Sequence, residues 1–184
     1  MTTETASVEH LACPRASWED LRFPATAINP PGTVNDPDFD TTKGGWLFSP
    51  SATEVLFIVA QMPHSWIEGT EIRPHVHWEK TTSAEGDVYW NLNYQLSEIG
   101  TARQAAVDLS SATATVASDT ADVHQLTTFG AIDMTGFTLS CILVMQLSRV
   151  GGNAADTYGA DARLLEFDFH YQYGSAGSRQ EFVK

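Results

Sequence analysis

The chain has 184 residues, 42% of them hydrophobic, which is enough for one domain with a buried core. Its 23 acidic and 10 basic residues give a formal net charge of −13. This balance argues against a nucleic-acid interface, which needs clustered lysine and arginine, and against binding to an anionic membrane surface.

Residues 1–44 are predicted to form an extended arm that gains order by lying on a surface. Most of the chain's eight prolines lie in this segment: Pro14, Pro24, Pro30, Pro31 and Pro37. Proline donates no backbone hydrogen bond and favours an extended conformation in the residue before it. A short apolar anchor at residues 17–23 interrupts the segment, and Ser17 is a candidate helix N-cap there. Residues 1–10 lack the apolar stretch of a secretory signal.

From residue 45 onward the sequence is patterned as β-strands separated by turns. The expected strand segments combine aromatic and β-branched residues or alternate in polarity: 45–49, 54–62, 73–79, 87–97 and 163–173. In the last of these, alternation predicts that Leu165 and Phe167 face one way and Glu166 the other. Residues 101–120 are undecided between a short helix and a weak edge strand. We expect an all-β fold, a jelly-roll-like two-sheet antiparallel sandwich formed by residues 45–184, preceded by the extended N-terminal arm.

Two closely spaced histidines mark the most distinctive segment, residues 62–79. On a strand, His75 and His77 project to the same side, and this spacing suits a metal ion. Together with Gly69 they resemble the opening of the cupin motif, G-x5-H-x-H. His170, on the polar face of another predicted strand, would complete a three-histidine site.

Two features oppose a cupin site. The glutamate that the cupin motif places after its second histidine is missing at the expected distance, because Glu79 comes too early and Glu85 too late. The second cupin motif is absent as well. The alternative is that His75 and His77 are structural, hydrogen-bonding to neighbours such as Glu79 or packing under Trp66, and on this basis we expect no cofactor.

Signatures of common enzyme classes are missing, since the chain has no P-loop, no G-x-S-x-G nucleophile elbow and no dinucleotide-binding fingerprint. Glu166 and Asp168 share a strand face, as a glycosidase pair would. Acid–base chemistry needs a desolvating pocket, however, and we expect these side chains to be solvated. Cys13 and Cys141 are expected to be free thiols. We therefore predict no catalytic residues and a protein that is not an enzyme.

Three segments carry recognisable motifs. They are Trp-Glu-Asp-Leu-Arg-Phe-Pro at 18–24, Pro-Asp-Phe at 37–39, and Pro-His-x-Trp-x-x-Gly-Thr-x-Ile-x-Pro-His-Val-His-Trp at 63–78. In these motifs the chain resembles a family of tailed-bacteriophage virion structural proteins. The resemblance implies a capsid decoration or cement protein that stabilises the head by binding across capsomer joints. It also implies two partners, the major capsid protein and further copies of the chain in a homotrimer. Such a protein is made in the bacterial host cytoplasm and ends on the capsid surface of the virion.

Apolar side chains within or near these motifs are predicted to bind the partners: Trp18, Leu21, Phe23, Pro24, Phe39 and Trp66. The arm would lie over a neighbouring subunit and gain order on binding. Removing residues 1–40 is therefore expected to abolish capsid binding while leaving a folded sandwich.

Two alternatives to the decoration role stay open. The first is a tail, neck or fibre-attachment virion protein, in which Tyr89, Tyr171 and Tyr173 form a platform for stacking on sugars. The second is a cupin-like metal-binding protein that uses the three histidines named above.

Overall fold

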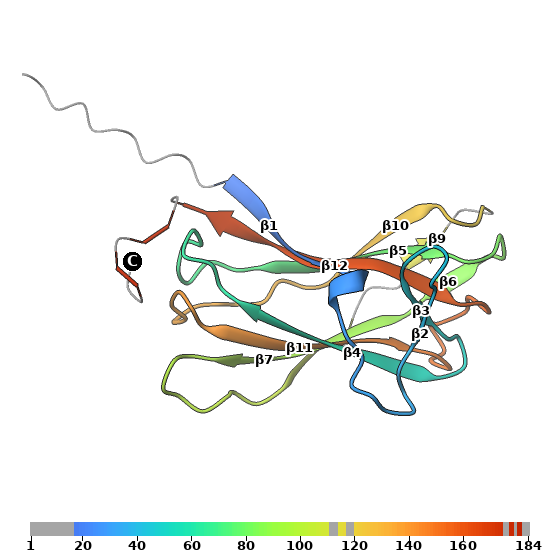
Figure 1. Ribbon diagram of the computed structural model, residues 1–184, viewed down its shortest axis with the longest axis horizontal. Helices are drawn as coiled ribbons and strands as arrows, with labels where there is room; N and C mark the ends of the chain where they lie inside the picture. Colours follow the sequence, from blue (N-terminus) through green and yellow to red (C-terminus); the bar gives the residue numbers. More distant parts are fainter. Residues whose placement is uncertain (1–16, 111–113, 117–119, 175–176, 179, 182–184) are drawn as a thin grey trace, which may run out of the picture.

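The computed structural model describes residues 17–110, 114–116, 120–174, 177–178 and 180–181, and β-strands dominate it (Figure 1). In chain order the strands are β1 (Ser17–Pro24), β2 (Asp38–Phe39), β3 (Trp46–Phe48), β4 (Thr53–Gln61), β5 (Arg73–Lys80), β6 (Gly86–Val88), β7 (Trp90–Ser97), β8 (Val107–Ser110), β9 (Ala114–Val116), β10 (His124–Thr128), β11 (Ile142–Val150) and β12 (Ala162–Tyr173). One 3-10 turn, Ala25–Ala27, follows β1. Within the described residues there is no α-helix, and so none that would be long and apolar enough to cross a bilayer.

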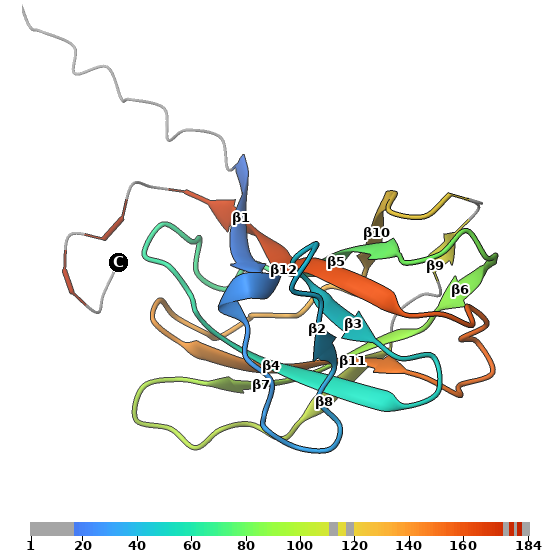
Figure 2. The same ribbon diagram turned by 45° about the vertical axis from the view of Figure 1, so that its right-hand side comes forward.

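The strands form two antiparallel sheets that pack face to face (Figures 1 and 2). The larger sheet has the order β10-β5-β12-β3-β2, with β1 also paired to β12, and the smaller sheet has the order β4-β11-β7-β8. A short ladder of β6 and β9 lies outside both sheets. This arrangement confirms the predicted all-β, two-sheet antiparallel sandwich.

Alternation along the strands fills the space between the sheets with aromatic and aliphatic side chains. Trp78 from the larger sheet and Trp90 from the smaller sheet are both fully buried. Phe48 meets Trp90 edge to face, with 5.0 Å between ring centroids. A period of two in the sequence therefore places one side of each long strand in a common core.

The predicted boundary at residue 44 differs from the structure, because residues 17–44 belong to the sandwich. β1 pairs with β12 along its whole length, from Ser17 opposite Tyr173 to Pro24 opposite Glu166, and β2 pairs with β3. Ser17 thus begins a strand and does not cap a helix. The two-residue spacing of Leu21 and Phe23, which pack against the core, was the strand signal within this proline-rich stretch. The part of the predicted arm at residues 1–16 lies outside the described residues.

A β-bulge in β12 changes which side chains face the core. The register shifts between Leu164, opposite Trp78, and Glu166, opposite His77, so Leu165 is an extra residue in the ladder. Leu164 is consequently the buried leucine, and the prediction that Leu165 faces the same way as Phe167 is wrong. Beyond the bulge the predicted alternation holds. In the undecided segment 101–120, β8 is an edge strand of the smaller sheet.

Candidate functional site

A group of titratable side chains occupies the outer face of the larger sheet, where β1, β12, β5 and β10 are neighbours. We call it the histidine cluster, and its members are Asp20, Arg22, His75, His77, His124, Glu166, Asp168 and His170. β5 and β12 are interior strands with a hydrogen-bonded neighbour on each side. The backbone beneath the cluster is therefore held on rigid elements, as a precise binding site requires.

His75, His77 and Asp168 form the centre of this cluster. Asp168 lies directly opposite His75 in the β5–β12 ladder. Nε2 of His75 touches Oδ1 of Asp168, and Nε2 of His77 lies 3.4 Å from Oδ2 of the same carboxylate. One possible ligand atom from each residue falls within 4.8 Å of the other two. Only 5% of the His75 side chain and 4% of the Asp168 side chain are exposed, so both are almost completely removed from water.

The position of the proton on His75 makes its contact with Asp168 unusual. Nδ1 of His75 lies 3.3 Å from the carbonyl oxygen of Arg73, and since a carbonyl can only accept, Nδ1 carries a proton. In a neutral imidazole, Nε2 then presents a lone pair to the carboxylate. Oδ1 of Asp168 is buried and accepts no hydrogen bond of acceptable geometry from the described residues. Two electron-rich atoms thus face each other, and either a second proton on His75 or a cation between them removes the repulsion.

The pKa values of the two central histidines move in opposite directions. Burial lowers the pKa of His75, but the adjacent Asp168 carboxylate outweighs burial, and this pKa lies above its ordinary value. Burial also lowers the pKa of His77, and repulsion from His75 and His124 offsets the attraction of Asp168, so this pKa lies below its ordinary value. The environment of His77 therefore favours its neutral form more than the environment of His75 does.

His124 and His170 flank the central group. Nε2 of His124 lies 2.6 Å from Nδ1 of His77, and this contact orients the His77 ring. The His170 ring lies close to the His75 ring, with 4.5 Å between centroids. Nε2 of His170 pairs with Oδ1 of Asp20 at 2.8 Å, so this nitrogen is engaged with β1 and not with the central group.

A hollow of about 380 Å³ opens beside the cluster, and His77, His124 and Asp168 contribute to its lining. In the same lining, Arg22 donates two hydrogen bonds to Glu166, one from Nε at 2.5 Å and one from a terminal nitrogen at 2.7 Å. The hydrogen bond and charge of Glu166 raise the pKa of Arg22, which therefore stays cationic. The hollow gives a small polar ligand access to the central group.

Part of this cluster was predicted from the sequence. His75 and His77 share a face, as predicted, but Asp168 takes the place beside them that His170 was expected to fill. The expectation that Asp168 is solvated is wrong, because Asp168 is 3% exposed. Glu79, the expected hydrogen-bond partner of the two histidines, instead forms an ion pair with an arginine of β12.

From the sequence, Asp168 was not placed beside the histidines, and His124 was not proposed as a site residue. Asp168 follows Glu166 on the polar side of β12, but only the register between β5 and β12 puts it opposite His75, and no local pattern encodes that register. His124 follows an Ala-, Ser- and Thr-rich segment. The strand His124–Thr128 shows no regular alternation of polar and apolar residues, so the local sequence carries no clear strand signal.

A second surface, on the outer face of the smaller sheet, carries no charged side chain across three strands. The outward residues of β4, β11 and β7 form what we call the uncharged face: Thr53, Val55, Phe57, Val59, Gln61, Asn91, Asn93, Gln95, Ser97, Ile142, Val144, Gln146, Ser148 and Val150. All of these residues lie in the described part of the chain. A net charge of −13 makes this lack of Asp and Glu unexpected for a sheet face that only meets water.

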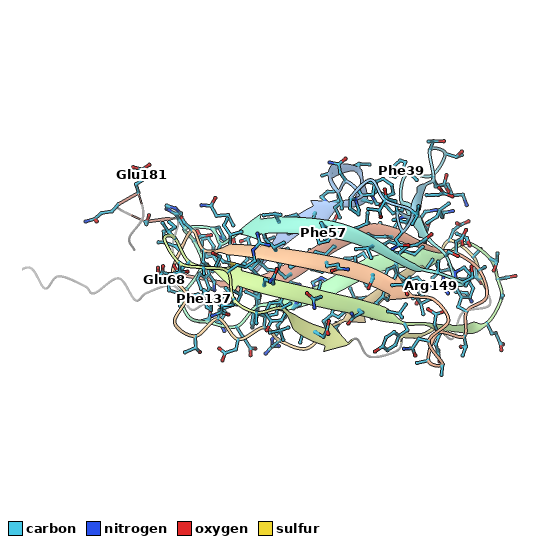
Figure 3. The ribbon with its side chains drawn as sticks, turned by 90° about the horizontal axis from the view of Figure 1, so that it is seen from below. Phe39, Phe57, Glu68, Phe137, Arg149 and Glu181 are labelled. Atoms are coloured by element: carbon cyan, nitrogen blue, oxygen red, sulfur yellow. The ribbon has the colours of Figure 1, made fainter. Side chains whose placement is uncertain are left out.

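Figure 3 shows this face, with Phe57 labelled on β4 and with β11 and β7 beside it. Val59, Val144 and Gln95 form one row across the three strands. Phe57 is 44% exposed and Val59 is 60% exposed. The surface is therefore open, and it offers apolar and amide groups to a partner.

Charged groups begin at the rim of the uncharged face. Asp108 on β8 accepts a hydrogen bond from the Asn93 amide at 2.8 Å, and Arg103 donates one to Gln95 at 3.3 Å. A centre depleted of charge and surrounded by a polar rim is the pattern of protein–protein interfaces.

The predicted partner-binding residues of β1 point to both sides of the larger sheet. Trp18 is 44% exposed on the outer side, where the Arg73 guanidinium lies 4.8 Å from the centre of its ring. Pro24 is exposed at the end of β1. Leu21 and Phe23 instead pack against the core, so they stabilise the sandwich and offer little surface to a partner.

The remaining aromatic candidates have little surface to offer. Trp66 is fully buried, so its prediction as a contact residue is wrong; a bridge to Tyr173 ties this segment to the end of β12. Phe39 is partly buried and packs edge-on against Trp46, with 4.8 Å between centroids. The predicted sugar-stacking platform is not formed, because Tyr171 faces inward and is 5% exposed.

The chain matches no protein-family model and no sequence among curated proteins. Among solved structures, dimeric latent PorU from Porphyromonas gingivalis is similar with a TM-score of 0.39 and 13% identity, over 95% of this chain and only 14% of that one. The module CBM35 from Cellvibrio japonicus Abf62 has a TM-score of 0.42 and 10% identity, over 90% of this chain and 100% of that one. TmCBM61 in complex with beta-1,4-galactotriose has a TM-score of 0.34 and 10% identity, over 86% of this chain and 88% of that one. These likenesses transfer no ligand or partner to the present chain.

Proposed function

We propose that the protein is a structural component of a tailed-bacteriophage virion, a decoration protein that binds the capsid across capsomer joints and has no catalytic role. The uncharged face is the observation that carries this proposal. Bringing a flat, neutral sheet face against another protein requires no stripping of water from charged groups, whereas burying unpaired charges is costly. The resemblance of three segments to virion structural proteins supplies the identity of the partner, the major capsid protein.

The size of the uncharged face bears on the number of copies that bind together. Three strands about 4.8 Å apart, each with up to nine residues at about 3.3 Å per residue, cover on the order of 400 Å². A stable interface buries about 800 Å² per partner. One copy would therefore bind weakly, and the proposed homotrimer would gain affinity by engaging several capsid subunits at once.

The three segments that resemble virion structural proteins lie in one part of the sandwich, which fits a resemblance that extends to the fold. Residues 18–24 lie in β1 and residues 37–39 include β2, while the segment 63–78 runs into β5. All three strands belong to the larger sheet, on the opposite side of the sandwich from the uncharged face.

A capsid-binding assay with a charged substitution tests the role of the uncharged face. Val144→Glu places a carboxylate in the middle row of the face, on a side chain that is only partly buried. We expect its affinity for capsids that lack the decoration protein, measured by co-sedimentation, to fall at least about tenfold because the charge would be buried unpaired. Val34→Glu is the matched control, since Val34 is 99% exposed and lies outside the face. Equal binding of both variants and the wild type would contradict the proposal.

Electron cryomicroscopy of gradient-purified particles tests where the protein lies on the virion. The proposal expects density for the sandwich at repeated sites on the head lattice, with the smaller sheet toward the capsid. Density confined to the neck, tail or fibres would refute decoration and favour the alternative virion role. Absence of the chain from purified particles, measured by mass spectrometry, would refute the virion role itself.

A further inference from the structure

We infer that His75, His77 and Asp168 bind a divalent first-row transition-metal ion, with Zn²⁺ as the probe ion. Both histidines come from β5 and the carboxylate comes from the neighbouring strand β12, so the ion would join two strands on the outer face of the larger sheet. This inference is independent of the proposed virion role, because it rests on the histidine cluster alone.

The distance between His77 and Asp168 matches the spacing of two ligands on one ion. Two ligands held about 2.1 Å from a tetrahedral zinc lie about 3.4 Å apart. Nε2 of His77 and Oδ2 of Asp168 are 3.4 Å apart, which is longer than an ordinary hydrogen bond between such groups. Nε2 of His75 and Oδ1 of Asp168 are in direct contact, and they would have to move apart before both could bind the same ion.

The hydrogen-bonding state of the central group suits a bound cation. The Nδ1 proton of His75 is directed at the Arg73 carbonyl, and this is how metal-binding histidines are usually held, with the other nitrogen free to coordinate. The free nitrogen faces Oδ1 of Asp168, a buried atom without a hydrogen bond from the described residues. A metal ion between these atoms would use both lone pairs and neutralise the buried carboxylate.

The second histidine is oriented by a neighbour outside the ligand set. Nδ1 of His77 lies 2.6 Å from Nε2 of His124, which leaves Nε2 of His77 toward Asp168. Such an outer contact fixes the ring of a ligand and usually changes metal affinity when it is removed. The hollow beside His77 and His124 provides the entry path for the ion.

The ligand types select the class of ion. Two imidazole nitrogens and one carboxylate suit Zn²⁺ and its first-row neighbours, whereas Mg²⁺ and Ca²⁺ prefer sites made of oxygen atoms. Three protein ligands also leave a fourth position of a tetrahedral ion for water or another small ligand.

Titration calorimetry on the full-length, tag-free chain tests this site. After treatment with EDTA and dialysis, we expect Zn²⁺ to bind with a stoichiometry of one per chain at this site and to raise the midpoint of thermal unfolding. Asp168→Asn, which keeps the shape of the side chain, is expected to weaken zinc binding at least about 100-fold, and His124→Ala about 10- to 100-fold. Circular dichroism checks that each variant is folded.

His170→Ala separates this ligand set from a three-histidine site, because the His170 ring lies beside His75 but its nitrogen pairs with Asp20. We expect its zinc affinity to stay within about threefold of the wild type, and X-ray absorption at the zinc edge to show two imidazole ligands. Loss of binding in His170→Ala with retention in Asp168→Asn would overturn the ligand set in favour of three histidines. If Asp168→Asn does not fold, His77→Gln replaces it. A wild-type chain whose unfolding midpoint does not respond to millimolar Zn²⁺ would overturn the inference outright, and would identify the central group as an imidazolium–carboxylate pair.

Discussion

Arg149 holds one end of the sandwich together from a position with no exposed surface (Figure 3). Its guanidinium donates two hydrogen bonds to the Asp156 carboxylate, at 2.8 and 2.7 Å. Three further hydrogen bonds reach the carbonyl oxygens of Phe48, Ala160 and Tyr158. The residue therefore joins β11 both to the end of β3 and to the loop before β12. Every part of the buried charge is matched by an acceptor.

Replacing Arg149 with methionine removes this charge but leaves Asp156 buried without its partner. We expect Arg149→Met to lower the free energy of unfolding by about 3–5 kcal/mol, since breaking a buried ion pair on one side carries that penalty. Urea denaturation followed by tryptophan fluorescence measures the difference. Arg103→Met, at an exposed position, serves as the control, and an equal effect of the two substitutions would be inconsistent with this role for Arg149.

Cys141 is a free thiol that is fully buried ahead of β11. Burial, with a contribution from Glu98, raises its pKa to about 12. Because only the thiolate reacts with alkylating reagents, the folded chain should not be labelled at Cys141 with iodoacetamide at pH 8. Peptide mapping should show labelling of this residue only after urea is added. Labelling in the native state at the rate of a free thiol would show that the site opens or that the pKa is not raised.

At the scale of the element, β12 shows what the sequence predicts and what it does not. Its alternating pattern places Phe167 and Phe169 in the core, and both are fully buried. The bulge at Leu165 could not be predicted, because it depends on how β12 meets β5 and not on any local residue preference. The same reason explains why only part of the candidate site could be predicted from the sequence. The pairing of His75 with Asp168 comes from the register of two strands that are far apart in the sequence.

For β1 the prediction gave too much weight to the surrounding prolines and too little to the strand pattern. Its prolines at the borders suggested an arm, while Leu21 and Phe23 already had the spacing of a strand with one buried side. Phe23 lies 6.2 Å from Phe167 and 6.1 Å from Phe169, measured between ring centroids. The strand therefore contributes to the core as well as to the hydrogen-bond ladder.

Removing β1 is expected to destabilise the sandwich. A chain that starts at residue 25 would lose the ladder with β12 and the aromatic contacts of Phe23. We expect its thermal midpoint to lie several degrees below that of a chain that starts at residue 17, by the loss of roughly 1–3 kcal/mol of apolar burial. Differential scanning calorimetry on both truncations makes the comparison. If the midpoints coincide, β1 does not contribute to stability, and the prediction that the sandwich folds without this segment would hold.

At the scale of the whole molecule, the two surfaces described above lie back to back. The histidine cluster is on the outer side of the larger sheet and the uncharged face is on the outer side of the smaller sheet, with the core between them. Figure 1 shows the two sheets as separate layers. If the uncharged face contacts the capsid, the histidine cluster points away from it. Metal binding and capsid binding should then be independent of each other.

Co-sedimentation with capsids in the presence of Zn²⁺ or EDTA checks this independence. We expect the capsid affinity to change by less than about twofold between the two conditions, because the core separates the sites and nothing in the fold requires them to be coupled. A change of tenfold or more, about 1.4 kcal/mol, would show that the two sites are energetically coupled or that the histidine cluster itself touches the capsid.

Ser17 pairs with Tyr173, so the start of the first strand and the end of the last strand lie side by side at one end of the sandwich (Figure 1). Neighbouring strands are only about 5 Å apart, so a short linker would be enough to close the polypeptide into a ring. Such a ring could be reopened at the Gly151–Gly152 turn between β11 and β12, giving a circular permutant with its new termini at a different place. It also follows that a reporter fused at either terminus of the sandwich would leave the opposite end unobstructed.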